Sequence, residues 1–254
     1  MPSYYDLPLL KPPVWTWEVP AYFFVGGAAG ASAVLALTAQ IGGADASLVR
    51  DARWIAAAGA VLSAPLLIAD LGRPERFLNM LRVFKPQSPM SVGAWTVAVF
   101  GGATTAALVM PGKPLRDAAA TVAALTGLVM STYTGVLLGA TANPVWKEHV
   151  RTLPAHFGAS ALGSAVALLE LRGHRDASLQ ALGLGAALFE STAGFALQKH
   201  DTIASVLAGP VPFLLRLLGK RKAAAAATLA GSLLTRFAWV AAGKASAMDV
   251  EKVL

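Results

Sequence analysis

A few polar side chains lie inside long apolar stretches of the sequence or at their ends, where a polar group is costly and often functional. They are Glu18, Asp70, Tyr133, Glu170, Glu190 and Arg236. Carboxylates take up and release protons, whereas a neutral phenol donates or accepts a hydrogen bond without changing charge. These residue types therefore fit proton exchange with a bound substrate, or proton movement through a membrane.

The composition indicates an integral membrane protein. Of the 254 residues, 56% are hydrophobic and 14% are charged, and the mean hydropathy is +0.58. A soluble domain carries about 25% charged residues, so this chain has too few charges to cover a water-facing surface. The formal net charge is +7, but the basic residues lie singly or in short runs between apolar segments. That pattern is typical of loops at a membrane surface rather than of nucleic-acid binding.

The sequence contains no cysteine, which excludes disulfides, thiolate-ligated iron–sulfur clusters, covalent c-type haem and thiol catalysis. A redox centre would therefore have to come from a partner. His149 and His174 fall in predicted loops, and His156 and His200 fall at predicted helix ends. Because a haem anchor needs histidines that face each other inside a bundle, we expect no haem, and we expect no metal site.

Apolar stretches of spanning length recur with short polar breaks, which predicts an all-α fold of about eight transmembrane helices. The segment before the first stretch contains acidic residues and prolines, so we expect a retained helix rather than a signal peptide. The seventh stretch is short and carries Gly209, Pro210 and Pro212, which predicts a kink or a late start. The expected spans are 19–41, 53–71, 91–110, 118–142, 153–171, 179–198, 202–218 and 223–242.

The longest predicted connection, 72–90, contains apolar residues at helical spacing between 75 and 84. A short helix lying in the membrane interface and an ordinary loop both remain open for it. Lysines and arginines number ten on each side of the predicted bundle when Arg216 is counted as a loop residue. The positive-inside rule therefore does not decide the orientation.

Alternating helix direction assigns a depth to each polar group. All of them except Glu170 fall in the half of the bundle on the side of the N-terminus. Trp15, Trp146 and Trp239 lie at the same face and suggest an interfacial aromatic belt. Glu190 and Arg236 lie deeper, either as a structural ion pair or at the wall of a polar cavity open toward the N-terminal side.

Several motifs resemble the NrfD family, the membrane subunits of polysulfide-reductase-type complexes. The opening WEVPAYFFVGGAAG (17–30) and the segment DLGRPERF (70–77), followed by SPMSVGAW (88–95), are similar to its distinctive stretches. YTGVLL (133–138) resembles its fourth-helix motif, and Gly209-Pro210 and LTRF (234–237) resemble it more weakly. The resemblance covers nearly the whole chain.

The resemblance implies two four-helix bundles that bind a quinone or quinol, either menaquinone or ubiquinone. It further implies an iron–sulfur, ferredoxin-like partner subunit that serves a molybdenum- or tungsten-bis-pterin catalytic subunit. The chain would be a multi-pass protein of a prokaryotic cell membrane, with its N-terminal side facing outward. This chain would be a quinone-reactive subunit rather than a complete enzyme.

By the same resemblance, Tyr133 matches the tyrosine that holds the quinone, and Glu18 stands near the place where some members carry a histidine. We expect Tyr133, Glu18 and Asp70 to act in the reaction, with Asp70 alternatively paired to Arg73 or Arg76 as a structural lock. The expected quinone contacts are Tyr133, Glu18, Trp17, Tyr22, Asp70 and Arg73, and the expected partner-docking residues are Arg73, Arg76, Arg82 and Lys85.

Two other functions stay open. Glu190, Arg236 and Glu170 are candidates for a proton path across the bundle, although only Glu170 serves the far half. The chain is alternatively a structural anchor that tethers its partner and binds no quinone.

Overall fold

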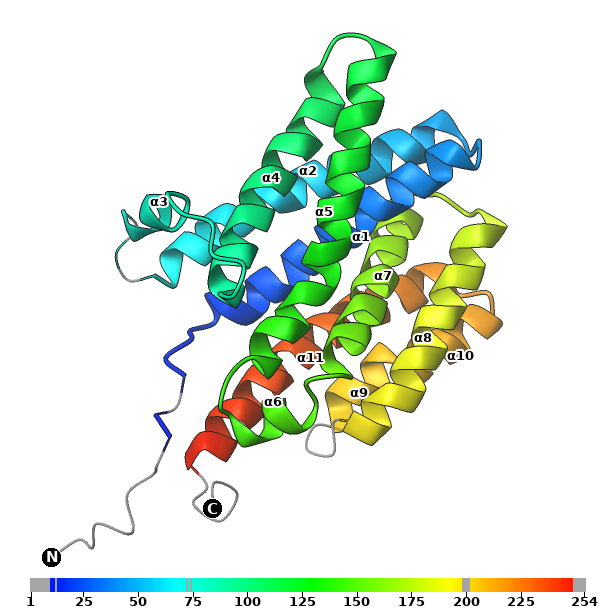
Figure 1. Cartoon of the computed structure of the whole chain (residues 1–254). Helices are drawn as coiled ribbons and strands as arrows, with labels where there is room; N and C mark the ends of the chain where they lie inside the picture. Colours follow the sequence, from blue (N-terminus) through cyan, green and yellow to red (C-terminus); the bar gives the residue numbers. More distant parts are fainter. Residues whose placement is uncertain (1–9, 12, 72, 74, 198–201, 249–254) are drawn as a thin grey trace, which may run out of the picture.

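The computed structural model describes residues 10–11, 13–71, 73, 75–197 and 202–248, and these residues form an all-helical protein (Figure 1). Five helices are long and apolar enough to cross a membrane, and the prediction of a multi-pass helical membrane protein is confirmed at that level. The prediction of eight spans stays a prediction. The five are α1 (Glu18–Ile41), α2 (Ala46–Ala69), α4 (Pro89–Val109), α5 (Lys113–Gly139) and α11 (Arg221–Met248).

The remaining helices carry more polar residues or are shorter. α7 and α8 have 19 and 21 residues, close to the length of α4, and α9 and α10 follow each other across a break. α3 and α6 are single short turns at the N-terminal side, the side on which α1 begins. The bounds are α3 (Arg76–Met80), α6 (Pro144–Glu148), α7 (Leu153–Leu171), α8 (Ala177–Leu197), α9 (Thr202–Ala208) and α10 (Pro210–Leu217).

Some predicted helix ends were wrong by a turn or two. α2 begins at Ala46 rather than at Arg53, because the Asp45 carboxylate accepts a hydrogen bond from the Ser47 backbone N–H and caps the helix. α5 begins at Lys113, and α11 continues to Met248. The predicted end of the sixth span at residue 198 lies outside the described residues.

The break predicted in the seventh stretch is confirmed. Gly209 adopts φ −114° and ψ −82° and separates α9 from α10, whose first residue is Pro210. Proline has no backbone N–H and is tolerated at the first position of a helix, where that donor would be unpaired. In the 75–84 segment the structure has only the five-residue helix α3, which is shorter than the interfacial helix considered from the sequence.

Contacts divide the helices into two packed groups (Figure 1). α1, α2, α4 and α5 form one group, and α7, α8, the α9–α10 pair and α11 form the other. α7 packs against both α1 and α5 and so joins the groups, while α11 also reaches α1. The N-terminal ends of α1 and α4 and the C-terminal ends of α2 and α5 therefore meet at one end of the first group.

α1 and α5 cross with their backbones in contact at two glycines. A Cβ on Gly30 would lie 2.3 Å from the carbonyl oxygen of Gly127, and a Cβ on Gly127 would lie 2.6 Å from that of Gly30. Small residues allow this approach, which is how helices pack closely in lipid. Neither backbone can move aside cheaply, so both positions require glycine.

We expect Gly127→Ala to destabilise the protein by roughly 1–3 kcal/mol or more, because the added methyl overpacks a backbone contact. Thermal unfolding in detergent measures the effect. Gly102→Ala is the matched control, since a Cβ at this exposed α4 position meets nothing within 4 Å. Equal stability of the two variants would contradict the role of the crossing.

Candidate functional site

A hollow of about 90 Å³ lies at the N-terminal side, where the ends of α1, α2, α4 and α5 meet. Its walls are mainly apolar and aromatic, and three of the predicted site residues, Tyr22, Asp70 and Tyr133, line it together. Glu18, Trp17 and Arg73 are not among the lining residues. The lining residues are Trp15, Val19, Tyr22, Phe23, Leu67, Asp70, Leu71, Met80, Met90, Gly93, Ala94, Tyr133 and Leu137.

Tyr133 is held by the α4 backbone. A Cβ on Gly93 would lie 2.6 Å from Cε1 of the tyrosine ring and 2.9 Å from its hydroxyl oxygen, so the ring lies flat on the space that this glycine leaves. The side chain is buried, and its hydroxyl lies beside the Gly93 backbone but completes no hydrogen bond of normal geometry among the described residues. A buried hydroxyl without a partner is free to bond a ligand oxygen.

The other predicted quinone contacts on α1 are placed differently from one another. The Tyr22 ring is buried, and its hydroxyl lies 4.0 Å from the Met130 sulfur, which is a weak acceptor. Oε2 of Glu18 is buried without a hydrogen-bond partner, one helical turn before Tyr22. Trp17 is 62% exposed and is not among the residues that line the hollow.

Asp70 joins the end of α2 to the segment before α1. Its Oδ1 accepts hydrogen bonds from the backbone N–H of Thr16 at 3.2 Å and from the Thr16 hydroxyl at 3.1 Å. Arg73 is exposed, and no ion pair of Asp70 occurs among the described side chains. The alternative that Asp70 pairs with Arg73 as a structural lock was therefore wrong, because the carboxylate bonds to Thr16 instead. The Arg76 side chain lies outside the described residues, so the pairing with Arg76 stays a prediction.

The predicted docking residues lie on the loop beside the hollow. Arg73, Arg82 and Lys85 are exposed, and the loop also exposes Leu78 and Phe84. The loop is continuous with the hollow because Leu71, Met80 and Met90 line it. The loop beside the hollow thus carries both positive charge and exposed apolar surface.

Three tryptophans that were expected in an interfacial belt instead pack against one another at the N-terminal side of the protein. Trp15 stacks on Trp146 with ring centroids 5.3 Å apart, and Nε1 of Trp146 donates to the Trp239 carbonyl at 2.8 Å. Trp146 and Trp239 are 1% and 2% exposed, respectively. The belt interpretation was wrong for this pair because α6 folds back onto α11, where Gly243 leaves room for the Trp146 ring. The sequence carries no signal that separates a buried tryptophan from a belt tryptophan.

A second polar cluster is buried between α7, α8 and α11. Nδ1 of His156 lies 3.4 Å from Oε1 of Glu190, and neither atom completes a hydrogen bond of normal geometry. Arg236 does not form the expected ion pair with Glu190 within 4.0 Å; it donates to the Phe157 carbonyl at 3.0 Å and lies over the Phe157 ring at 4.0 Å. The ion-pair interpretation was wrong because a carbonyl and an aromatic face take the guanidinium.

The sequence reasoning missed His156 as a member of this cluster. Its position near the start of α7 was expected, but its complete burial was not. A partial signal existed in the sequence, because His156 precedes Ser160 and Ser164 at four-residue spacing on one helical face.

A seam of hydroxyl groups leads from this cluster toward the far side, the side on which α11 begins. Ser160 of α7 donates to Ser232 of α11 at 2.8 Å, and Ser164 and Thr228 continue the two faces. The next ionisable group on α7 is Glu170, six residues or about 9 Å beyond Ser164. The seam is therefore interrupted by apolar packing in its far half.

Glu170 is paired at the far end. Nη1 of Arg216 donates to Oε1 of Glu170 at 2.7 Å, and both side chains are buried. The assignment of Arg216 to a loop was wrong, because the residue lies within α10 and its guanidinium fills the space left by Gly183 of α8. Within the described chain no group of His, Asp or Glu is arranged to hold a metal ion.

Residues 1–198 match the polysulfide reductase family NrfD_2. The chain belongs to this family. No match was found among curated proteins. The matched region contains every described residue that lines the hollow, whereas Arg236 of the buried cluster lies beyond it. Membership of the NrfD_2 family indicates a membrane subunit of a redox complex that associates with redox partner subunits.

We expect the link between Asp70 and Thr16 in this NrfD_2 protein to survive Asp70→Asn, since the amide oxygen still accepts both hydrogen bonds. Asp70→Ala should release the segment before α1, at a cost of about 1 kcal/mol because the bonds are solvent-exposed. Limited proteolysis within residues 13–17 measures the release. Cleavage that rises equally in both variants would show that charge, rather than the acceptor oxygen, holds the segment.

Proposed function

We propose that this chain is the quinone-reactive membrane subunit of a prokaryotic respiratory oxidoreductase. It exchanges electrons with a docked iron–sulfur, ferredoxin-like subunit, which in turn serves a molybdenum- or tungsten-bis-pterin catalytic subunit. The family membership supports the redox complex, and the hollow on the N-terminal side supports the quinone. By analogy with the family, that side faces out of the cell.

The observation that carries the proposal is the free hydroxyl of Tyr133 in an apolar hollow at a membrane surface. A quinone ring needs apolar walls and a neutral hydrogen-bond donor at its oxygen. Tyr133 supplies the donor, and Trp15, Phe23 and Leu137 supply apolar wall. The phenol stays neutral at ordinary pH, so it can donate to a quinone oxygen or accept from a quinol.

The hollow must widen to admit a ring. Its volume is about 90 Å³, whereas a cavity that holds benzene measures about 150 Å³. Met80 and Met90 lie at its rim, and Met90 is 60% exposed. Methionine side chains are flexible and adapt to irregular contacts, so these two residues form the part of the wall that moves.

Proton exchange falls to the carboxylates near the hollow. Asp70 lines the hollow and keeps one carboxylate oxygen free of the bonds to Thr16, which both go to Oδ1. Glu18 lies one turn before Tyr22 and has a buried oxygen without a partner. Either carboxylate can pass protons between the ring oxygen and water at the N-terminal surface.

The partner subunit docks on the loop that borders the hollow. Arg73, Arg82 and Lys85 give this surface positive charge, and Leu78 and Phe84 give it exposed apolar area. Such a surface suits a partner with acidic side chains around an apolar centre. Docking here brings an iron–sulfur cluster next to the hollow, which electron transfer requires.

We expect Tyr133→Phe to lower quinone-linked kcat/KM of the assembled complex by about tenfold, the effect of losing roughly 1.4 kcal/mol of hydrogen bonding. Glu18→Gln should slow turnover by removing a proton acceptor while leaving assembly intact. Steady-state quinol oxidation or quinone reduction measures both variants. Wild-type turnover in both would favour a structural anchor without quinone chemistry.

A paired glycine substitution on α4 controls for nonspecific damage. Gly93→Ala drives a methyl into the Tyr133 ring and should lower turnover at least as much as Tyr133→Phe, whereas Gly102→Ala should leave turnover unchanged. The two substitutions are chemically identical and lie on the same helix. Equal turnover in both variants would remove Gly93 as the support of the tyrosine.

The buried seam favours a second candidate function, proton movement coupled to electron transfer. Glu190, His156 and Arg236 carry buried polar atoms without partners, and the Ser160–Ser232 bond extends the polar face toward Glu170. Water would have to bridge the interval of about 9 Å between Ser164 and Glu170. This interruption makes the quinone site the better supported function.

If protons cross along the seam, Glu190→Gln should abolish the pH change in liposomes that accompanies turnover, while quinone chemistry continues. Glu148→Gln is the control, because Glu148 is an exposed acid on the same side of the protein. A pH-sensitive dye inside the liposomes reports the change. Unchanged proton movement in Glu190→Gln would exclude this residue from any path.

A further inference from the structure

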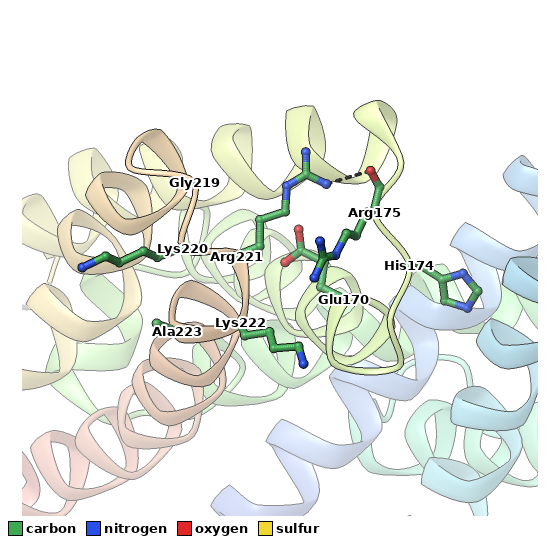
Figure 2. A pocket seen from close by; sticks show the side chains of 8 residues that line it. All are labelled: Glu170, His174, Arg175, Gly219, Lys220, Arg221, Lys222 and Ala223. Carbon is green, nitrogen blue, oxygen red and sulfur yellow. Dashed lines mark hydrogen bonds between the residues drawn. The ribbon is translucent and has the colours of Figure 1, made fainter.

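A large basic cavity opens at the far side of the second helix group (Figure 2). Its volume is about 570 Å³, and two connecting loops form its walls. One is the loop between α7 and α8, and the other joins α10 to α11. The lining residues are Glu170, His174, Arg175, Gly219, Lys220, Arg221, Lys222 and Ala223.

The two loops are fixed to each other and to the first helix group. Nη1 of Arg221 donates to the Arg175 backbone carbonyl at 2.8 Å, the contact drawn as a dashed line in Figure 2. Nε2 of His174 lies 3.1 Å from the Asp51 carboxylate of α2. The cavity is therefore held in shape by a contact between its two loops and by a contact to α2.

The charge of the cavity selects an anion. Arg175, Lys220, Arg221 and Lys222 line it, and none of them forms an ion pair with a carboxylate among the described residues. Lys220 and Lys222 are exposed, so their ammonium groups are free to move onto a ligand. The Lys222 and Ala223 backbone N–H groups in the first turn of α11, which have no acceptor within the helix, add to the positive potential.

One buried group points to a second feature of the ligand. Glu170 is one of the lining residues, its side chain is 4% exposed, and its Oε2 is buried without a hydrogen-bond partner. The other oxygen is neutralised by Arg216. A ligand that fits must therefore offer a hydrogen-bond donor next to its negative charge.

The surroundings indicate that the ligand is a lipid. The cavity lies where α7 and α10 end and where α8 and α11 begin, at the membrane surface. Leu214, Leu217 and Leu218 of the adjoining helix end are 58%, 61% and 69% exposed. Basic side chains at the surface with exposed leucines toward the membrane match the two parts of a phospholipid.

We propose that this cavity binds the headgroup of an anionic glycerophospholipid whose phosphate carries a hydroxyl-bearing group, of which phosphatidylglycerol is the simplest. Arg175, Lys220, Arg221 and Lys222 hold the phosphate. Glu170 accepts a hydrogen bond from the headgroup hydroxyl, and the acyl chains lie along the exposed leucines of α10. The site lies at the opposite end of the protein from the quinone hollow.

The test compares lipid retention by the full-length protein in native mass spectrometry after addition of phosphatidylglycerol or phosphatidylcholine. The K220E/K222E double variant should bind phosphatidylglycerol about tenfold more weakly than the wild-type protein, as expected for two lost charge-assisted contacts. The matched control is K113E/R116E, which reverses two exposed charges on the same side near the start of α5. Both pairs are on the surface, so folding is preserved.

Phosphatidylglycerol retained by the wild type and the control but lost by K220E/K222E supports the site. Equal loss in both double variants, or equal binding of phosphatidylcholine, would overturn it, because surface charge or general lipid affinity would then suffice. A last measurement compares the binding of glycerol 1-phosphate, a soluble compound, with the binding of phosphatidylglycerol. If it binds as tightly as the lipid, the occupant is a soluble phosphate compound and the lipid assignment fails.

Discussion

The backbone contact between Gly30 and Gly127 sets the distance between α1 and α5, and the rest of the first helix group follows from it. Tyr22 lies eight residues before Gly30 on α1, and Tyr133 lies six residues after Gly127 on α5. Both tyrosines are thus within two or three turns of the crossing, on the same side of it, and both line the hollow. Lipid gives helices little hydrophobic reason to associate, so close backbone packing and van der Waals contact must fix the geometry. A larger distance between α1 and α5 would separate the two phenols, so they would no longer line one hollow.

Two polar regions lie close together at the N-terminal side, and aromatic rings separate them. Phe23 lines the hollow, and its ring centroid lies 6.4 Å from that of Phe157. The Arg236 guanidinium in turn lies over the Phe157 ring and donates a hydrogen bond to the Phe157 carbonyl. The cluster of His156, Glu190 and Arg236 is therefore one aromatic pair away from the candidate quinone site, yet no chain of hydrogen bonds joins them among the described residues. The aromatic pair therefore separates the hollow from the buried cluster.

The two ends of the protein differ in chemistry because different helices terminate there. At the N-terminal side, Trp15 and Met80 of α3 contribute to the wall of an apolar hollow. At the far side, Asp51 of α2 binds His174 and Arg172, which ties the first group to the α7–α8 loop beside the basic cavity. α7 runs between the two ends and contributes His156 at one and Glu170 at the other.

The sequence by itself determined the helical membrane fold, most of the helix positions and the family, because apolar length, glycine and proline breaks, and the DLGRPERF motif are local properties of the chain. It also named Tyr22, Asp70 and Tyr133, which the structure brings to one hollow. Only the tertiary structure decided the partners: Asp70 with Thr16, Arg216 with Glu170, Trp146 against Gly243, and Arg236 on Phe157 rather than on Glu190. Those pairs join residues 46 to 97 positions apart, with the exact choice set by which helix faces meet. A local pattern assigns a residue to a helix and a depth, but helix rotation and crossing distance arise from packing, and they select the contact.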